Sequence, residues 1–170
     1  TRIVETVLTP VSITDRGGGF YLVDLGQVYA GVPRISFSGG SSGTLVGMLG
    51  GYALNGAGAI DPAQNQSTPM SCYAMLNGTN FTFQPAEYLG MRYFQITNSP
   101  MPVTTTNFNF IERHSSMDES RSAFISPNAT LNAVWDLMKQ TLPIDAQEEF
   151  IDSMRQKGGF LGDGFQESLA

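Results

Sequence analysis

The residues best suited to chemistry lie in the C-terminal stretch 147–170. Asp152, Arg155 and Asp163 occur there among glycines, behind a segment with the apolar spacing of a helix. Carboxylates and a guanidinium placed close together can bind a polar ligand, although they can equally form an ion pair that closes a loop. The last residues have the pattern of another helix without a stop signal, so we expect this chain to be a segment of a longer protein.

A second candidate is the string GGSSG at residues 39–43, which has the G-x-S-x-G pattern of serine hydrolases. Asp61 and His114 follow it in the order of such a triad. That motif requires a strand before it and a helix after it, whereas residues 44–49 alternate like a strand. We therefore predict a glycine-rich β-turn. His114 is the only histidine, which excludes a histidine-based metal cluster, and we expect neither a metal nor a cofactor.

The elements that must position these residues change character along the chain. From residue 1 to about 125, short runs rich in β-branched and aromatic residues alternate with turns, which predicts an antiparallel β-sandwich. The predicted strands cover residues 20–25, 32–38, 44–49, 81–83, 91–97 and 107–113. Residues 50–71 have the composition of a long polar insertion.

A helix is predicted from the Ser126-Pro127 pair, because serine caps helices well and proline suits the first helical position. Apolar residues then recur at helical spacing until Pro143, which predicts a helix over roughly 127–142. Trp135 lies on the apolar stripe and is expected to be buried. We accordingly predict a sandwich domain at residues 1–125, and we predict that residues 126–170 are the N-terminal part of a helical domain.

Composition limits the partners. The net charge is −6 and nine Lys and Arg are spread along the chain, which argues against binding to nucleic acid or to an anionic membrane. No apolar run approaches the ~20 residues of a membrane-spanning helix. Cys72 is the only cysteine, so an internal disulfide is impossible. Sequons at Asn65, Asn77, Asn80 and Asn128 suggest N-glycosylation and a secreted, extracellular protein.

Several strings, taken in order, resemble the α-L-rhamnosidase family of inverting glycosidases. They are FYLVDLGQVYAG at 20–31, FQPAEYLGMRYFQI at 83–96, FISPNATLNAVW at 124–135, and QEEFIDSMRQKGGFLGDG at 147–164. The resemblance implies mainly β architecture, with an antiparallel β-sandwich followed by the first helix or helices of an (α/α)6 toroid. It also implies a rhamnose-containing oligosaccharide, polysaccharide or glycoside as ligand, and contact with the remainder of the toroid. By the same resemblance, Asp152, Arg155 and Asp163 would line a sugar pocket, with Phe160 against an apolar sugar face.

The departures from the family pattern concern catalysis. Gln156 stands where the family has its general-acid Glu, the spacing from Asp152 to Arg155 is one residue shorter, and the usual proline is missing. An amide has no proton to transfer, and general-acid catalysis contributes typically ~10²–10⁴ in rate. The family's second carboxylate, the general base, would lie far downstream of this chain. Glu167 is an extra carboxylate, four residues after Asp163, that could substitute as the acid.

We therefore predict a segment of an α-L-rhamnosidase-like glycoside hydrolase that acts on terminal α-L-rhamnosyl residues but is inactive as this chain. One alternative is a non-catalytic carbohydrate-binding protein or pseudoenzyme, which Gln156 favours. Another is a lyase that acts on rhamnosyl-glucuronate and needs no acid at position 156.

Overall fold

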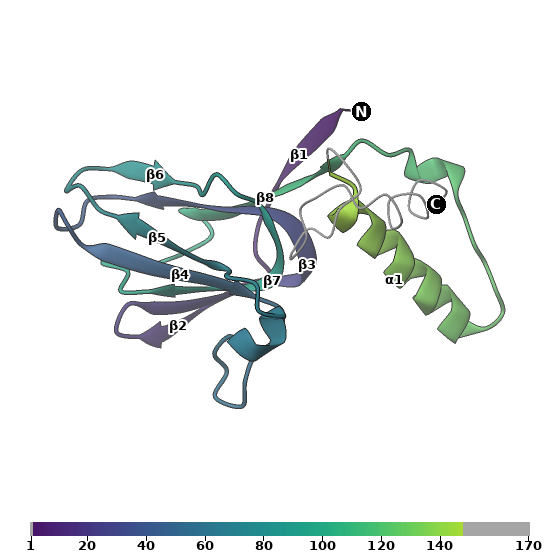
Figure 1. Cartoon of the computed structure of the whole chain (residues 1–170), viewed down its shortest axis with the longest axis horizontal. Helices are drawn as coiled ribbons and strands as arrows, with labels where there is room; N and C mark the ends of the chain where they lie inside the picture. Colours follow the sequence, from purple (N-terminus) through teal and green to yellow (C-terminus); the bar gives the residue numbers. More distant parts are fainter. Residues whose placement is uncertain (1, 148–170) are drawn as a thin grey trace.

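Strand β3 (Phe20–Phe37) organises the molecule, because it belongs to both layers of a β-sandwich (Figure 1). The computed structural model describes residues 2–147. The first half of β3 pairs with β2 (Ser12–Gly17) and with β7 (Leu89–Thr97), and the pairing with β7 continues as far as Gly31. The remainder of β3 pairs with β8 (Phe108–Ser115) and β6 (Phe81–Phe83). Strand β7 continues to β4 (Leu45–Gly51) and then β5 (Ser71–Met75), while β1 (Ile3–Leu8) lines the outer edge of β8. All of these pairings are antiparallel.

A large bulge bends β3 from one layer into the other. Between paired positions, β3 advances from Asp24 to Tyr29 while β7 advances from Tyr93 to Met91. Gly26 lies at the bend with φ +89°, a left-handed backbone conformation that favours glycine. The sequence predicted two separate strands here; they form one strand because the bulge interrupts its pairing with β7 without ending it.

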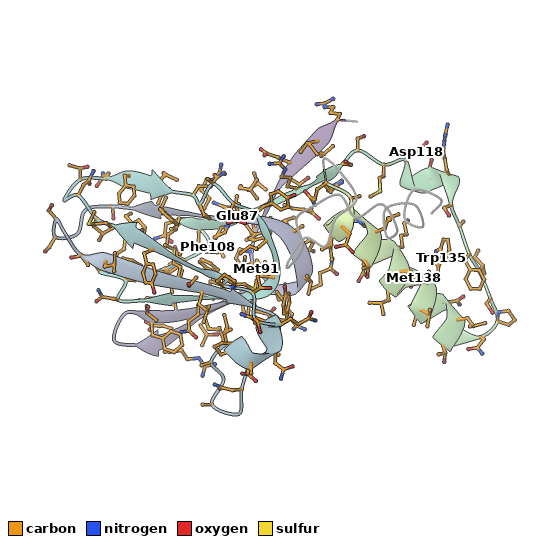
Figure 2. The ribbon with its side chains drawn as sticks, in the orientation of Figure 1. Glu87, Met91, Phe108, Asp118, Trp135 and Met138 are labelled. Carbon is orange, nitrogen blue, oxygen red and sulfur yellow. The ribbon has the colours of Figure 1, made fainter. Side chains whose placement is uncertain are left out.

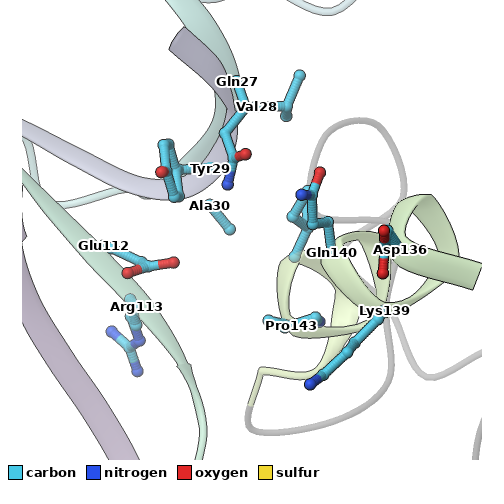
Figure 3. A pocket seen from close by; sticks show the side chains of 11 residues that line it. Gln27, Val28, Tyr29, Ala30, Glu112, Arg113, Asp136, Lys139, Gln140 and Pro143 are labelled. Carbon is cyan, nitrogen blue, oxygen red and sulfur yellow. The ribbon is translucent and has the colours of Figure 1, made fainter. Parts of the chain in front are cut away.

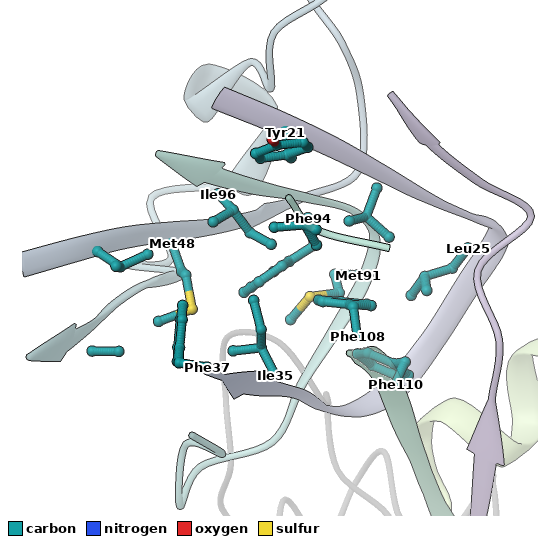
Figure 4. Packing of buried hydrophobic residues seen from close by; sticks show 14 of the residues in the cluster. Tyr21, Leu25, Ile35, Phe37, Met48, Met91, Phe94, Ile96, Phe108 and Phe110 are labelled. Carbon is teal, nitrogen blue, oxygen red and sulfur yellow. The ribbon is translucent and has the colours of Figure 1, made fainter. Parts of the chain in front are cut away.

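The core lies between the two layers and consists of alternating side chains from β3, β4, β7 and β8 (Figure 4). The rings of Phe94 on β7 and Phe108 on β8 have centroids 5.7 Å apart, and both side chains are buried. Because strand side chains alternate between faces, each layer turns one face inward. The predicted sandwich is confirmed, although strands β1, β2 and β5 were not predicted.

The connection between β4 and β5 is long, as predicted for residues 50–71. It contains the short helix η1 (Pro62–Asn65) and a bridge between Leu54 and Ile60. Its composition is polar, yet Ile60 and Met70 are buried and fix it to the sandwich. A second short helix, η2 (Glu119–Arg121), follows β8.

Helix α1 (Ala129–Asp145) begins and ends later than the predicted 127–142. The backbone N–H and carbonyl of Ser126 are both hydrogen-bonded to the side-chain amide of Asn132. The cap of the helix is Asn128, whose side chain accepts from the backbone N–H of Thr130 at 2.9 Å. Pro143 lies inside the last turn rather than after it. Among residues 2–147, no helix is long and apolar enough to cross a membrane.

The prediction that Trp135 is buried was wrong. Its side chain is partly buried, and its ring centroid lies 5.7 Å from that of Phe124, in the segment before the helix. Figure 2 shows Trp135 and Met138 well apart from the core residues Met91 and Phe108. No side chain of α1 is buried, because the helix turns its apolar stripe away from the sandwich; Leu131, Leu137 and Met138 are 49%, 63% and 62% exposed.

Candidate functional site at the sandwich–helix junction

The residues predicted to form the sugar site, Asp152, Arg155, Gln156, Phe160 and Asp163, lie outside the described residues, as does Glu167. Their predicted roles therefore stay predictions. The structure does describe how the chain reaches this stretch, and which side chains surround the point from which it departs.

A clasp formed by Ser115 and Gln147 ties the end of α1 to the end of β8. The backbone N–H of Ser115 donates to the carbonyl oxygen of Ala146 at 2.6 Å, and the Ser115 hydroxyl donates to the carbonyl oxygen of Gln147. The side-chain Nε2 of Gln147 donates to the carbonyl oxygens of Arg113 at 2.8 Å and Ile144 at 3.1 Å. This clasp fixes where the predicted sugar-binding stretch begins.

Gln147 is almost fully buried, with 2% of its surface exposed. Its Oε1 atom finds no hydrogen-bond partner among the described residues. A buried amide oxygen without a hydrogen bond reduces the stability of the folded state, and native proteins seldom leave such groups unsatisfied. In the sequence Gln147 is the first residue of a family string, and in the structure its side chain holds the chain in place at the start of that string.

A pocket of about 330 Å³ opens beside the clasp, between the bend of β3, the end of β8 and one face of α1 (Figure 3). Strand residues form one wall and helix residues the other. The lining residues are Gln27, Val28, Tyr29, Ala30, Glu112, Arg113, Asp136, Lys139, Gln140, Pro143 and Ile144. The pocket therefore has mixed polarity, with acidic, basic, amide, phenolic and apolar groups.

Tyr29 is the pocket residue on β3 whose pKa is shifted by its surroundings. Burial raises the pKa of the Tyr29 hydroxyl above its ordinary value, and the negative charge of Glu112 raises it further, while a hydrogen bond from the Gln27 side chain acts in the opposite direction. Arg113 lies over the ring of Tyr88, 5.1 Å from its centroid, in a cation–π contact. Tyr29 is thus a neutral hydroxyl that can donate and accept hydrogen bonds at neutral pH.

Gln27, Tyr29 and Gln140 were not predicted from the sequence as possible binding residues. Gln27 and Tyr29 fall within the string at 20–31 that carried part of the family resemblance, but nothing in their spacing indicates a pocket. Their proximity to Gln140 arises because the clasp returns α1 to β8. A long-range contact of this kind leaves no local pattern in the sequence.

The first two family strings meet each other in the structure and stabilise the sandwich. Asp24, from the string at 20–31, accepts hydrogen bonds from Arg92, from the string at 83–96, at 3.0 and 3.1 Å. It also accepts from the backbone N–H of Gly26 at 2.7 Å. Burial on its own would raise the pKa of Asp24, but the hydrogen bonds from Arg92 and Gly26 and the positive charge of Arg92 together lower it.

The serine-hydrolase interpretation of residues 39–43 is not supported by the structure. These residues form the turn between β3 and β4, with Gly39, Gly40 and Gly43 at positive φ, and a strand rather than a helix follows. His114 contacts the backbone oxygen of its neighbour Ser115 at 2.7 Å, and Asp61 caps η1. Within residues 2–147, no cluster of three or more His, Cys, Asp or Glu could hold a metal ion.

The predicted sequons differ in their accessibility. Asn77, Asn80 and Asn128 are exposed. Asn65 is buried, and its Nδ2 donates to the carbonyl oxygen of Gly50 at 3.0 Å. Nδ2 is the atom that a glycan would occupy, and in the folded chain it is hydrogen-bonded to Gly50. Glycosylation of the four sequons remains a prediction.

Residues 14–114, from β2 to β8, match the bacterial α-L-rhamnosidase concanavalin-like domain. The chain belongs to this family. The family resemblance inferred from the sequence is thereby confirmed for the sandwich. No curated protein matches the chain.

Solved structures of α-L-rhamnosidases share this fold. The enzyme from Dictyoglumus thermophilum aligns with a TM-score of 0.79 at 18% identity, over 92% of this chain and 18% of that one. The Streptomyces avermitilis α-L-rhamnosidase complexed with L-rhamnose aligns with a TM-score of 0.72 at 25% identity, over 89% and 15%. The Aspergillus terreus enzyme gives a TM-score of 0.73 at 17% identity, over 88% and 18%. The chain thus spans less than a fifth of the length of these relatives.

Proposed function

We propose that this chain is the sandwich and the first toroid portion of an α-L-rhamnosidase-like glycoside hydrolase that recognises terminal α-L-rhamnosyl residues. The observation that carries the proposal is the family match over residues 14–114. Further support comes from the similar fold of a Streptomyces avermitilis α-L-rhamnosidase, whose structure is a complex with L-rhamnose. The division into a sandwich at 1–125 and a helical domain from 126 is part of this proposal.

The roles of individual residues follow the family strings. Asp152 and Asp163 accept hydrogen bonds from sugar hydroxyls, Arg155 donates to them, and Phe160 packs against an apolar sugar face. Gln156 occupies the general-acid position and can donate a hydrogen bond to the glycosidic oxygen but cannot transfer a proton. The protein therefore binds α-L-rhamnosides and hydrolyses them very slowly.

A non-catalytic, carbohydrate-binding role is the second candidate, and Gln156 is the specific residue that favours it. The two candidates differ in their response to one substitution. In a latent enzyme, Gln156→Glu restores turnover, since a carboxylic acid in a partly apolar pocket can keep its proton near neutral pH. In a dedicated binding protein, the same substitution leaves turnover at background.

The test uses the complete polypeptide to which this chain belongs, with an aryl α-L-rhamnoside as substrate. We expect Gln156→Glu to raise kcat by at least ~10². Gln166→Glu adds the same charge ten positions later in the sequence and serves as the matched control, with no expected gain. High activity with Gln156 in place would contradict the assignment of this residue, and absence of rhamnoside binding in every form would contradict the proposed ligand.

A further inference from the structure

We propose that the pocket between β3, β8 and α1 is a binding site for one neutral sugar unit. The described residues that line it come from the two strands and the helix. The inference goes beyond the proposed function, because it rests on the chemistry of the pocket itself and does not require hydrolysis.

The orientation of α1 is the first argument. Asp136, Lys139, Gln140 and Pro143 all line the pocket, and their spacing places them on one face of the helix. A helix beside a sheet ordinarily turns its apolar stripe toward the sheet. Here the polar face lines the space against the strands, while Leu131 and Met138 of the apolar stripe are exposed. The space between helix and sandwich is therefore a hydrophilic pocket rather than a packed interface.

The charge balance is the second argument. Two acidic residues, Glu112 and Asp136, and two basic residues, Arg113 and Lys139, line the pocket, so their formal charges cancel. A site for a phosphate or a polyanion would have an excess of basic groups, and a cation site an excess of carboxylates. A ligand without net charge fits this balance.

The hydrogen-bonding groups are the third argument. Gln27 and Gln140 each provide a carbonyl acceptor and an amide donor, and Tyr29 provides a hydroxyl that can do both. A sugar hydroxyl also donates and accepts, so it can bind to groups of either kind. In Figure 3, Gln27 and Tyr29 lie on the strand side and Gln140 on the helix side of the same space.

Size and apolar lining also favour a sugar. Sites for small molecules typically measure ~300–1,000 Å³, and about 330 Å³ lies at the low end of that range. This volume suits a single sugar unit better than a long oligosaccharide. Val28, Pro143 and Ile144 provide apolar surface against which the C–H groups of a sugar ring can pack.

The experiment is a titration of the isotopically labelled 170-residue chain, followed by the NMR signals of backbone amides and glutamine side-chain amides. The probes are methyl α-L-rhamnopyranoside, methyl β-D-glucopyranoside and, as the charged comparison, inorganic sulfate. We expect saturable shifts at Gln27, Tyr29 and Gln140 with at least one of the two sugars, and none there with sulfate. Shifts at these residues with sulfate alone would overturn the proposal, as would sugar-induced shifts confined to residues outside the pocket or no saturable shift at all.

Substitutions locate the site. Gln27→Ala and Gln140→Ala each remove hydrogen bonds to the sugar, which predicts an increase in Kd of about fivefold or more. Gln64→Ala, an exposed residue on η1, is the matched control and should leave Kd unchanged. Unchanged Kd in both pocket variants would overturn the proposal. Hydrolysis of the aryl α-L-rhamnoside and the amide shifts at Gln27, Tyr29 and Gln140 are separate readouts, so a failure to hydrolyse rhamnosides and a failure of the pocket to bind sugar are separate results.

Discussion

Asp24 and Arg92, which are 68 positions apart in the sequence, form a two-contact ion pair that joins β3 to β7 beside the bend of β3. The carboxylate also accepts a hydrogen bond from the backbone N–H of Gly26, the residue whose left-handed conformation makes the bend. The pair therefore stabilises the conformation that carries β3 from one layer of the sandwich to the other.

Replacing this carboxylate should reduce stability in a pH-dependent way. We expect Asp24→Asn to lower the free energy of unfolding at pH 7 by ~1 kcal/mol, a modest value because the Arg92 side chain is 38% exposed and solvent screens the charges. The folded state lowers the pKa of Asp24, so the charge-dependent stabilisation is present above the ordinary value of 3.8 and is lost as pH falls through the lowered pKa. Urea unfolding at pH 7 and in strong acid should show the difference between the two proteins shrinking in acid.

The control for this substitution is Asp118→Asn. Asp118 pairs with Arg121 three residues later, at 3.2 Å, but the two side chains are 58% and 84% exposed. An exposed pair of this kind contributes little, so the free energy of unfolding should change by less than ~0.5 kcal/mol. Equal losses in the two variants would contradict a special role for the pair at the bend.

Gly31 should tolerate no side chain. A Cβ atom there would lie 2.0 Å from the carbonyl oxygen of Ile111 and 2.8 Å from the ring of Phe110, so β3 and β8 would have to separate. We expect Gly31→Ala to cost about 3 kcal/mol or more in thermal or chemical unfolding. Gly56→Ala is the matched control, since nothing lies within 4 Å of its Cβ position, and should be close to neutral.

The two large aromatic residues Phe94 and Trp135 should respond differently to truncation. Phe94→Ala removes a buried ring that contacts Phe108 across the sandwich and should cost ~3–5 kcal/mol. Trp135 is only partly buried and contacts the tilted ring of Phe124, so Trp135→Ala should cost less than ~1.5 kcal/mol. Chemical denaturation of both variants measures the contrast, and a loss at Trp135 equal to that at Phe94 would mean that α1 is packed more tightly than its exposure indicates.

Glycosylation provides a chemical test of burial. When the chain is expressed through a eukaryotic secretory pathway, Asn65 should remain unmodified because its Nδ2 is buried and bonded to Gly50. Asn77 and Asn80 lie in an exposed loop and are the sites where we expect glycan. Peptide mass spectrometry reads each site separately. Glycan on Asn65 would show that this side chain is accessible to the glycosylation machinery, before or after the connection between β4 and β5 folds.

Much of the sandwich could be predicted from the sequence, because alternating residues such as Tyr21, Val23 and Leu25 repeat the period of a strand. The edge strands β1 and β2 were missed because exposed strands need little apolar alternation; residues 12–17 include Asp15, Arg16 and Gly17. Strand β5 was missed because it follows a polar connection and has exposed Tyr73 and Met75.

The orientation of α1 could not be predicted from its period. Helical spacing identifies an apolar stripe, but it does not say what covers that stripe. Trp135 was therefore assigned to a core that the described residues do not provide. The pocket is a second example, because Tyr29 and Gln140 come together through hydrogen bonds at Ser115 and Gln147 that no local pattern encodes.

The clasp also holds together the two ends of the segment that contains α1. Residues 116–145 leave the sandwich at Ser115 and return to it, since Ser115 is hydrogen-bonded to Ala146. The point at which residue 147 departs is consequently set by β8 and not by the length of α1. Loop-closure entropy varies slowly with length, by ~0.6 kcal/mol for each doubling. Relatives could therefore lengthen, shorten or exchange residues 116–145, together with the pocket wall on α1, while the chain at Gln147 keeps the same attachment point on the sandwich.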